Sequence, residues 1–240
     1  MELTTVLYAV LILSAAYLIR GIAGFGSGLV AVPLLALKFP LTQVVPLIVL
    51  LDYIGSAGQG FKNRQLIAWR EQLPLIPFTL IGVAVGLFLL KGMSTTFMRQ
   101  ILGTFVIVYA VYQLLPLPAL QGSRILVIPF GFLGGFIGTI FGTGGPFYVM
   151  YLNLRGLAKN AFRATFATNF LIDGAIRLTA YASVGLLRRE VLLALLAALP
   201  IVGLGLYVGG RIHVGLSQQG FVRLISILLI ATGAVLLMKG

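Results

Sequence analysis

Long apolar segments alternate along the chain with short links that carry basic residues, glycine or proline. A helix needs roughly 20 apolar residues to cross the hydrocarbon core of a membrane, so segments of that length predict spanning helices. The pattern predicts an all-α, polytopic membrane protein with eight principal helices and two half-length helices. The principal segments are Leu3–Ile19, Leu41–Gly60, Leu73–Leu90, Phe97–Leu115, Ile125–Phe141, Thr165–Val184, Val191–Val208 and Phe221–Met238, and the short ones are Leu29–Leu37 and Phe147–Leu154.

The order of these segments occurs twice, which indicates an internal duplication. In each half, a long segment meets a glycine-rich motif, a half-length segment follows, and three further long segments complete the set. Phe25-Gly26-Ser27-Gly28 matches Phe141-Gly142-Thr143-Gly144. Before the last long segment of each half, Thr96-Phe97-Met98-Arg99 matches Gly220-Phe221-Val222-Arg223.

The two predicted transmembrane repeats are residues 1–118 and 122–240, on either side of a proline-containing linker. If the half-length segment returns to the side from which the chain entered, three full crossings remain in each repeat and the second repeat is inverted. If it continues across, the repeats are parallel. We favour the inverted arrangement because the half-length segments end at Lys38 and Arg155, as half-helices that return to a membrane interface would.

Composition supports a membrane protein. Only 9% of the 240 residues are charged and 60% are hydrophobic, with a mean hydropathy of +1.09, whereas soluble proteins carry roughly 25% charged residues. The net charge is +12, but the basic residues are scattered through short links, which indicates contact with anionic lipid headgroups and not with nucleic acid. Leu3–Ile19 lacks a basic leader and a small-residue cleavage site, so we expect a retained span.

The two glycine-rich motifs are predicted to be helix breaks that bind an anion. Unwound backbone at membrane depth is tolerated only where it is buried in protein or lines a cavity. Glycine permits positive φ, and a helix that begins after such a break presents unpaired N–H groups and a partial positive charge. The predicted substrate-binding residues are Gly24, Gly26, Ser27 and Gly28 in the first break and Gly142, Thr143, Gly144 and Gly145 in the second.

Ser27 and Thr143 occupy matching positions, and we expect them to cap the half-helices while donating a hydroxyl to the ligand. In inverted repeats the two helix starts would converge near the membrane midplane, around a small oxyanion. A competing interpretation assigns glycines to close helix packing, and we adopt it for Gly131, Gly134, Gly135 and Gly138 of the fifth long segment. At the breaks, the matched hydroxyls and Pro146 favour a real discontinuity.

Five residues are candidates for ion coupling or for a substrate pathway: Arg20, Asp52, Asn169, Asp173 and Arg177. Asp52 has no basic residue one turn away, and is either a coupling or pathway acid or a hydrogen-bonded structural residue. Asp173 and Arg177 are four residues apart on one helix, which predicts a structural ion pair, with Arg177 as an anion-attracting group the alternative. Asn169 extends this polar stripe by one turn. Arg20 precedes the first break and faces either the substrate path or the membrane surface.

The residue types needed for enzymatic or metal chemistry are nearly absent. The chain has no cysteine, five carboxylates and one histidine, His213, so we expect no catalytic residues, no metal site and no cofactor. A nucleotide-binding motif is also missing, which argues against primary pumping by this chain. A structural subunit without transport activity would not require the duplicated breaks. These observations favour a transporter or a passive anion channel.

Further motifs lie at the ends of the spans. They are the Asn63–Arg70 loop that ends in Trp-Arg, the Phe162-Arg163-Ala164-Thr165 start of a span, and the two Phe-x-Arg starts. Together with the breaks, this set resembles the TauE/SafE sulfite exporter family over nearly the whole chain. The resemblance implies an eight-helix, duplicated transporter of the bacterial or archaeal inner membrane that moves sulfite, sulfonates or related sulfur anions outward. By position, the family's glycine motifs fall on Gly24, Gly26, Gly28, Gly142, Gly144 and Gly145.

The chain departs from the family pattern at four positions. Leu29 and Pro146 stand where a longer glycine run is common, Ala68 replaces an acidic residue often found before Trp, and Asp52 stands where small hydroxyl residues are usual. These departures leave the exact anion open.

We expect a secondary transporter that works by alternating access of its two halves and is driven by an ion gradient. The resemblance implies an exporter of sulfite or a sulfonate. The alternatives are a passive anion channel and a transporter of another anion such as thiosulfate or sulfoacetate. The expected partners are the anionic substrate and membrane lipid, and a homodimer is a further possibility.

Overall fold

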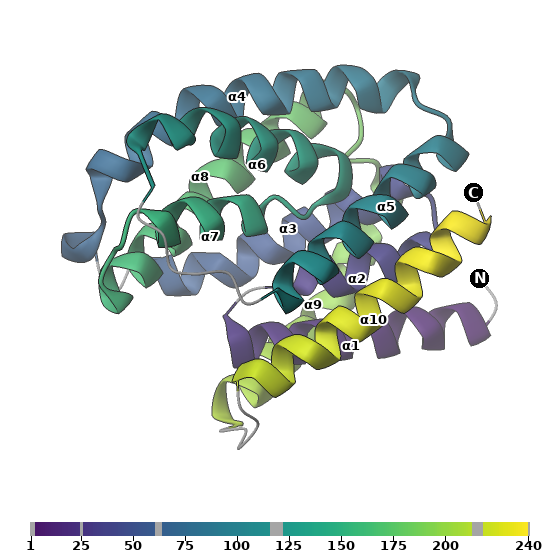
Figure 1. Cartoon of the computed structure of the whole chain (residues 1–240). Helices are drawn as coiled ribbons and strands as arrows, with labels where there is room; N and C mark the ends of the chain where they lie inside the picture. Colours follow the sequence, from purple (N-terminus) through teal and green to yellow (C-terminus); the bar gives the residue numbers. More distant parts are fainter. Residues whose placement is uncertain (1–2, 25, 61–63, 116–121, 213–217, 240) are drawn as a thin grey trace. The chain divides into compact units, whose positions relative to one another are not determined.

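The computed structural model describes residues 3–24, 26–60, 64–115, 122–212 and 218–239 (Figure 1). These residues form α-helices, two short 3-10 helices and connecting turns, with no strand among them. The α-helices are α1 (Leu3–Ala23), α2 (Ser27–Ala36), α3 (Leu41–Gly60), α4 (Trp69–Gly92), α5 (Thr95–Leu114), α6 (Val127–Phe141), α7 (Gly145–Leu154), α8 (Lys159–Ser183), α9 (Arg189–Arg211) and α10 (Gln218–Lys239), and the 3-10 helices are η1 (Arg64–Leu66) and η2 (Arg124–Leu126).

The predicted all-helical membrane class is confirmed. Among the described residues, six helical segments are long and apolar enough to cross a membrane, in α1, α4, α5, η2 with α6, α9 and α10. The shorter helices α2 and α3 are apolar, and α8 is 25 residues long but carries buried polar residues along one face. The count of eight spans therefore stays a prediction that depends on α3 and α8.

Most helices extend beyond the apolar segments that predicted them. The helix α4 begins at Trp69, before the predicted Leu73, and α8 begins at Lys159, before Thr165. Hydropathy marks the part of a helix that suits hydrocarbon, whereas backbone hydrogen bonds continue through polar first turns at the interface.

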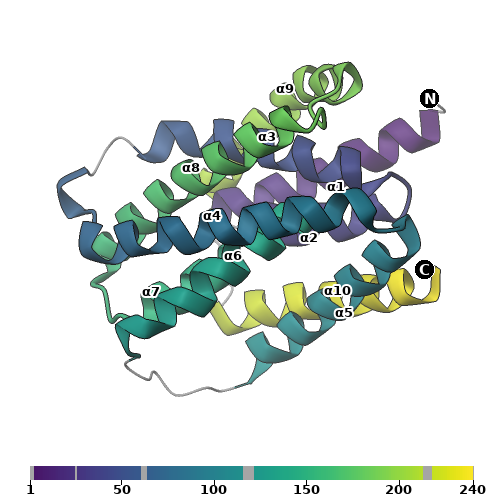
Figure 2. The ribbon, with the colours of Figure 1, turned by 90° about the horizontal axis from the view of Figure 1, so that it is seen from above.

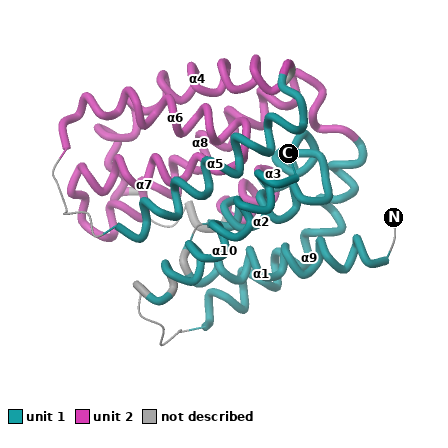
Figure 3. The backbone as a smooth tube through the Cα atoms, turned by 45° about the vertical axis from the view of Figure 1, so that its right-hand side comes forward, with its two compact units in different colours: residues 1–48, 93–117, 189–240 teal, residues 49–92, 118–188 magenta. Residues whose placement is uncertain are grey.

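Helix packing groups the chain into two compact units that do not follow the order of the sequence (Figure 3). The first unit contains residues 1–48, 93–117 and 189–240, and the second contains residues 49–92 and 118–188. The predicted repeats divide the chain differently. Repeats are defined by similar order along the sequence, whereas compact units are defined by which helices pack together. The repeats stay a prediction.

In the first unit, α1 packs along α9, α5 packs along α10, and α2 contacts α1, α5 and α10. Glycines bring the backbones close in both long contacts. A Cβ built on Gly21 of α1 would lie 2.8 Å from the Cα of Gly209, and a Cβ on Gly103 of α5 would lie 2.8 Å from the carbonyl oxygen of Gly233. Such small residues allow the close helix approach that is common in membrane proteins.

In the second unit, α4 packs along α6 (Figure 2), while α7 contacts α6 and α8, and α4 contacts α8. The predicted packing role of the α6 glycines is confirmed. A Cβ on Gly131 would lie 2.9 Å from the Cβ of Phe78 on α4, and a Cβ on Gly134 would lie 2.5 Å from the ring of Tyr148 on α7. The glycines of α6 thus allow both α4 and the half-length helix α7 to pack closely against it.

Candidate anion-binding site at the helix breaks

The first break separates α1, which ends at Ala23, from α2, which begins at Ser27. The N–H of Gly24 still donates to the carbonyl of Arg20 at 2.7 Å. Gly24 and Gly26 then have φ values of +83° and +98°, which residues with side chains rarely adopt. Phe25, between them, lies outside the described residues. Glycine is therefore required where the chain leaves one helix and enters the next.

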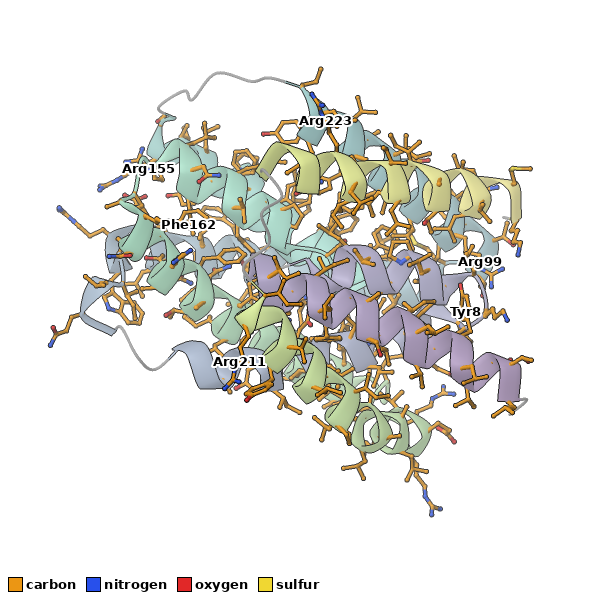
Figure 4. The ribbon with its side chains drawn as sticks, turned by 90° about the horizontal axis from the view of Figure 1, so that it is seen from below. Tyr8, Arg99, Arg155, Phe162, Arg211 and Arg223 are labelled. Carbon is orange, nitrogen blue, oxygen red and sulfur yellow. The ribbon has the colours of Figure 1, made fainter. Side chains whose placement is uncertain are left out.

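Arg20 and Ser27 meet at the first break. The Arg20 guanidinium Nη1 donates to the Ser27 hydroxyl at 3.2 Å, and both side chains are buried. Gly28 follows, also buried. The half-helix is also joined to α1 by Tyr8, labelled in Figure 4, whose hydroxyl donates to the Leu34 carbonyl at 2.7 Å. Arg20 thus lies against the break itself.

The second break separates α6, which ends at Phe141, from α7, which begins at Gly145. Gly142 has a φ of +68°, and its N–H donates to the carbonyl of Gly138 at 2.9 Å. Thr143 and the N-cap residue Gly144 follow, both buried. In both breaks, the chain leaves a helix through a glycine with positive φ and starts a ten-residue half-helix, about 15 Å long.

The prediction that Ser27 and Thr143 cap the half-helices is wrong. The N-cap positions are Gly26 and Gly144, so Ser27 follows the first N-cap and Thr143 precedes the second. Relative to the matched motifs, α7 begins later than α2. Pro146 accounts for the shift, because proline has no N–H and a fixed φ that suit the first turn of a helix.

Hydrogen-bond donors without partners gather at the second break. Thr143 is 3% exposed, and its Oγ1 has no hydrogen-bond partner within the described chain. The backbone N–H groups of Thr143, Gly144 and Gly145 also donate to no backbone carbonyl of the described chain. A buried polar group without a partner costs about 1–3 kcal/mol. A ligand that accepts hydrogen bonds from these groups would remove that cost.

Arg177 reaches the second break from α8. Its Nη1 donates to the carbonyl of Gly138 at 2.9 Å, its Nη2 pairs with the carboxylate of Asp173, and its Nε has no partner among the described residues. A Cβ built on Gly138 would lie 3.2 Å from the Arg177 Nη1 and 3.3 Å from the Cα of Gly144. The guanidinium and the break therefore both lie against Gly138, and they can approach it this closely because Gly138 has no side chain.

The predicted ion pair between Asp173 and Arg177 is confirmed, and the polar stripe on α8 is buried. Asp173 also accepts a hydrogen bond from the Tyr148 hydroxyl of α7 at 3.0 Å. One turn earlier, Asn169 accepts from the Gln72 side chain of α4 at 2.9 Å. The stripe thus connects α8 with α7 and α4 in the second unit.

Asp52, by contrast, lies on α3. Its side chain is buried, and its backbone carbonyl accepts a hydrogen bond from the Ser56 hydroxyl at 2.8 Å. His213 lies outside the described residues, and no cluster of potential metal ligands occurs among the described ones.

A further buried carboxylate, Glu71 on α4, was missed by the sequence reasoning. It accepts from the Tyr151 hydroxyl at 2.7 Å and from Arg155 Nε at 3.0 Å, and Arg124 lies 3.3 Å away. Arg155, labelled in Figure 4, directly follows α7. Tyr148 and Tyr151 are three residues apart on α7. Tyr148 joins this half-helix to Asp173 of α8, and Tyr151 joins it to Glu71 of α4. The signal in the sequence is this tyrosine pair within a short apolar segment.

Comparison with known proteins agrees with the apolar helices. The model of the sulfite exporter TauE/SafE family matches residues 8–236. The chain belongs to the TauE/SafE family. Probable inner membrane transporter protein TsaS from Comamonas testosteroni is 26% identical to it over 192 residues, which cover 78% of this chain and 80% of that protein. No solved structure matches the chain. The predicted resemblance is confirmed, and this TauE/SafE protein is a multi-pass membrane transporter.

Proposed function

We propose that this TauE/SafE protein is a secondary transporter that carries a small sulfur-containing anion, such as sulfite or a sulfonate, out of a prokaryotic cell across the inner membrane. The second break carries the proposal, because its unpaired hydroxyl and N–H groups lie in the same buried region as Arg177. An oxyanion with several acceptor oxygens fits such a set of donors. The family's description and the relative's name support a transporter of this class.

Each break combines a half-helix start, a hydroxyl residue and one buried arginine. Arg20 and Ser27 supply the charge and hydroxyl at the first break, and Arg177 and Thr143 do so at the second. Because Asp173 shares the charge of Arg177, an anion would be held by neutral donors, by half-helix dipoles and by part of the guanidinium charge, weakly enough to be released. The proposed substrate-binding residues remain Gly24, Gly26, Ser27, Gly28, Gly142, Thr143, Gly144 and Gly145.

The pairing of helices supports the duplication. The first helix of each half packs along the fourth α-helix of the other half, α1 along α9 and α6 along α4, and the equivalent helices α5 and α10 pack along each other. A duplicated chain that exchanges equivalent helices would produce this pattern. We propose inverted repeats of residues 1–118 and 122–240 with eight transmembrane helices, the first of each repeat being broken or re-entrant, and transport by alternating access of these repeats.

Uptake into proteoliposomes tests the function. Labelled sulfite, thiosulfate, sulfate and a short sulfonate are supplied to vesicles with and without a pH gradient. We expect sulfite or the sulfonate to accumulate to a level that changes with the pH gradient. A passive channel would instead give voltage-dependent current without accumulation, and a preference for thiosulfate or sulfate would change the proposed substrate.

Thr143→Val is expected to stabilise the empty protein and to weaken anion binding. The substitution removes a buried hydroxyl that has no partner in the described chain, whose burial costs about 1–3 kcal/mol. With an anion bound, the same change removes a hydrogen bond to a charged oxygen. The affinity for the anion should then be roughly 10–100-fold lower. Thermal unfolding with and without sulfite measures both effects. Thr143→Ser should bind like the wild type, and equal affinity of Thr143→Val would contradict the role of the hydroxyl.

A further inference from the structure

We propose that Asp173 is a proton-binding site that couples each transported anion to one proton. The anion and the Asp173 carboxylate compete for the Arg177 guanidinium. When the anion binds the guanidinium, the carboxylate takes up a proton. The inference rests on the proposed anion site at the second break, and adds the coupling ion and its binding residue.

Asp173 is held by two partners from two helices. Its Oδ2 pairs with the Arg177 Nη2 of the same helix, and its Oδ1 accepts from the Tyr148 hydroxyl of α7 at 3.0 Å. These side chains are 1%, 3% and 0% exposed. A buried charge pair of this kind is stable only while both members are present, because a single charge left behind is strongly disfavoured.

The surroundings of Asp173 supply no second cation within the described chain. Arg177 and Tyr181 face it from α8, and the Tyr181 hydroxyl donates elsewhere, to the Thr139 carbonyl at 2.7 Å. From α7 comes Tyr148, whose hydroxyl lies 3.2 Å from the Thr79 hydroxyl of α4. From α3 comes Tyr53, whose ring lies against Gly174. The charge of Asp173 is therefore balanced by Arg177 and by the hydrogen bond from Tyr148.

Arg177 has the means to change partners. Its Nε has no partner among the described residues, and its guanidinium lies against Gly138, which the Cα of Gly144 in the second break also approaches. An anion bound to the N–H groups of Thr143–Gly145 attracts the guanidinium, and the bond from Nη2 to Asp173 weakens. The buried carboxylate then lacks its cation, and binding a proton is the least costly way to remove the isolated charge.

The step balances without any redox chemistry: an anion binds, one proton from water converts the carboxylate to the carboxylic acid, and no covalent bond of the anion changes. Loss of that proton restores the ion pair and releases the anion. For a monovalent anion the cycle is electroneutral, so its direction follows the product of anion and proton concentrations on the two sides. Outward flux then depends on an excess of the anion in the cytoplasm.

Proton uptake during sulfite binding tests this coupling. The purified full-length protein is titrated with sulfite in buffers of different ionisation enthalpy, which reports the protons taken up for each anion bound. Asp173→Asn serves as the variant, and Glu71→Gln as the matched control, since Glu71 is also buried with an arginine and a tyrosine. Protonation of sulfite itself is the same in all three proteins and cancels in the differences.

We expect the wild type and Glu71→Gln to take up about one proton more for each anion than Asp173→Asn, as one titrating carboxylate allows. Asp173→Asn should also bind sulfite about tenfold more tightly, with weaker pH dependence, because the competitor for Arg177 is gone. A merely structural Asp173 would give weaker binding. Equal proton uptake by wild type and Asp173→Asn would overturn the coupling, whereas failure of the wild type to bind sulfite would overturn the anion site on which it rests.

If Asp173→Asn does not fold, the wild type alone decides the question in vesicles loaded with methanesulfonate, whose charge does not titrate near neutral pH. Efflux should carry about one proton for each anion and should not respond to an imposed membrane potential, as electroneutral movement requires. Efflux that follows the membrane potential without proton movement would overturn the proposal. Sulfite titration of the wild type separates this result from failure of the anion site.

Discussion

Arg177→Gln is expected to abolish anion transport and to destabilise the protein, while the double variant Asp173→Asn/Arg177→Gln recovers stability but not transport. The single change leaves the buried carboxylate of Asp173 without its cation, which costs about 3–5 kcal/mol. The double change removes both charges, so that this cost disappears. Anion binding is lost in both, because removing one partner of a buried charge interaction costs roughly 2–5 kcal/mol, or about 30- to 5,000-fold in affinity.

Thermal unfolding in detergent and sulfite uptake into proteoliposomes measure the two effects separately. Arg155→Gln is the matched control, because Arg155 also pairs with a carboxylate of the second unit, Glu71. It should lower stability and retain transport. If the double variant transports sulfite like the wild type, Arg177 is only a structural partner of Asp173, and the second break does not use it for binding.

Gly26→Val is expected to stop transport by straining the first break. Gly26 has a φ of +98°, and a Cβ built there meets nothing within 4 Å, so the change adds backbone strain without a collision. A β-branched residue in this region costs about 1–3 kcal/mol or more. The backbone is expected to relax toward negative φ, which shifts the start of α2 and separates Ser27 from Arg20.

Gly203→Val tests whether valine alone causes the effect. Gly203 lies in α9 of the same unit, also with nothing within 4 Å of a built Cβ, but its φ is not in the positive range. Valine is slightly better than glycine in a helix, so this variant should transport sulfite at the wild-type rate. Anion uptake normalised to the inserted protein gives the comparison. A correctly inserted Gly26→Val protein with undiminished uptake would show that the first break needs no special conformation.

Much of the helix arrangement could be predicted because membrane helices are marked by their own composition. The bounds of α3, Leu41–Gly60, agree with the apolar segment, and both half-length helices were expected. The ion pair of Asp173 and Arg177 was predictable as well, since side chains four residues apart meet on any helix. Predictions of this kind depend only on residues near one another in the sequence. Packing against distant segments does not change them.

Contacts between distant segments could not be derived in this way. Arg177 precedes no glycine motif, yet it hydrogen-bonds to Gly138, 39 residues earlier in the chain. Glu71 was not singled out in the sequence, but it is buried against Tyr151, 80 residues later. The order of residues along one helix does not indicate which helix will pack against it. The start of α7 was misplaced for a local reason, because Pro146 shifts it relative to α2.

By itself the sequence determined that the protein is a helical membrane protein, where its helices are interrupted, and which family it resembles, because hydropathy and glycine motifs are local properties. Only the tertiary structure decided which groups share a site. It joined Arg177 of α8 to the break between α6 and α7, and left the hydroxyl of Thr143 buried without a partner among the described residues. The reason is physical: glycines such as Gly138 and Gly144 let backbones approach closely, and that approach is set by the surfaces of several helices at once.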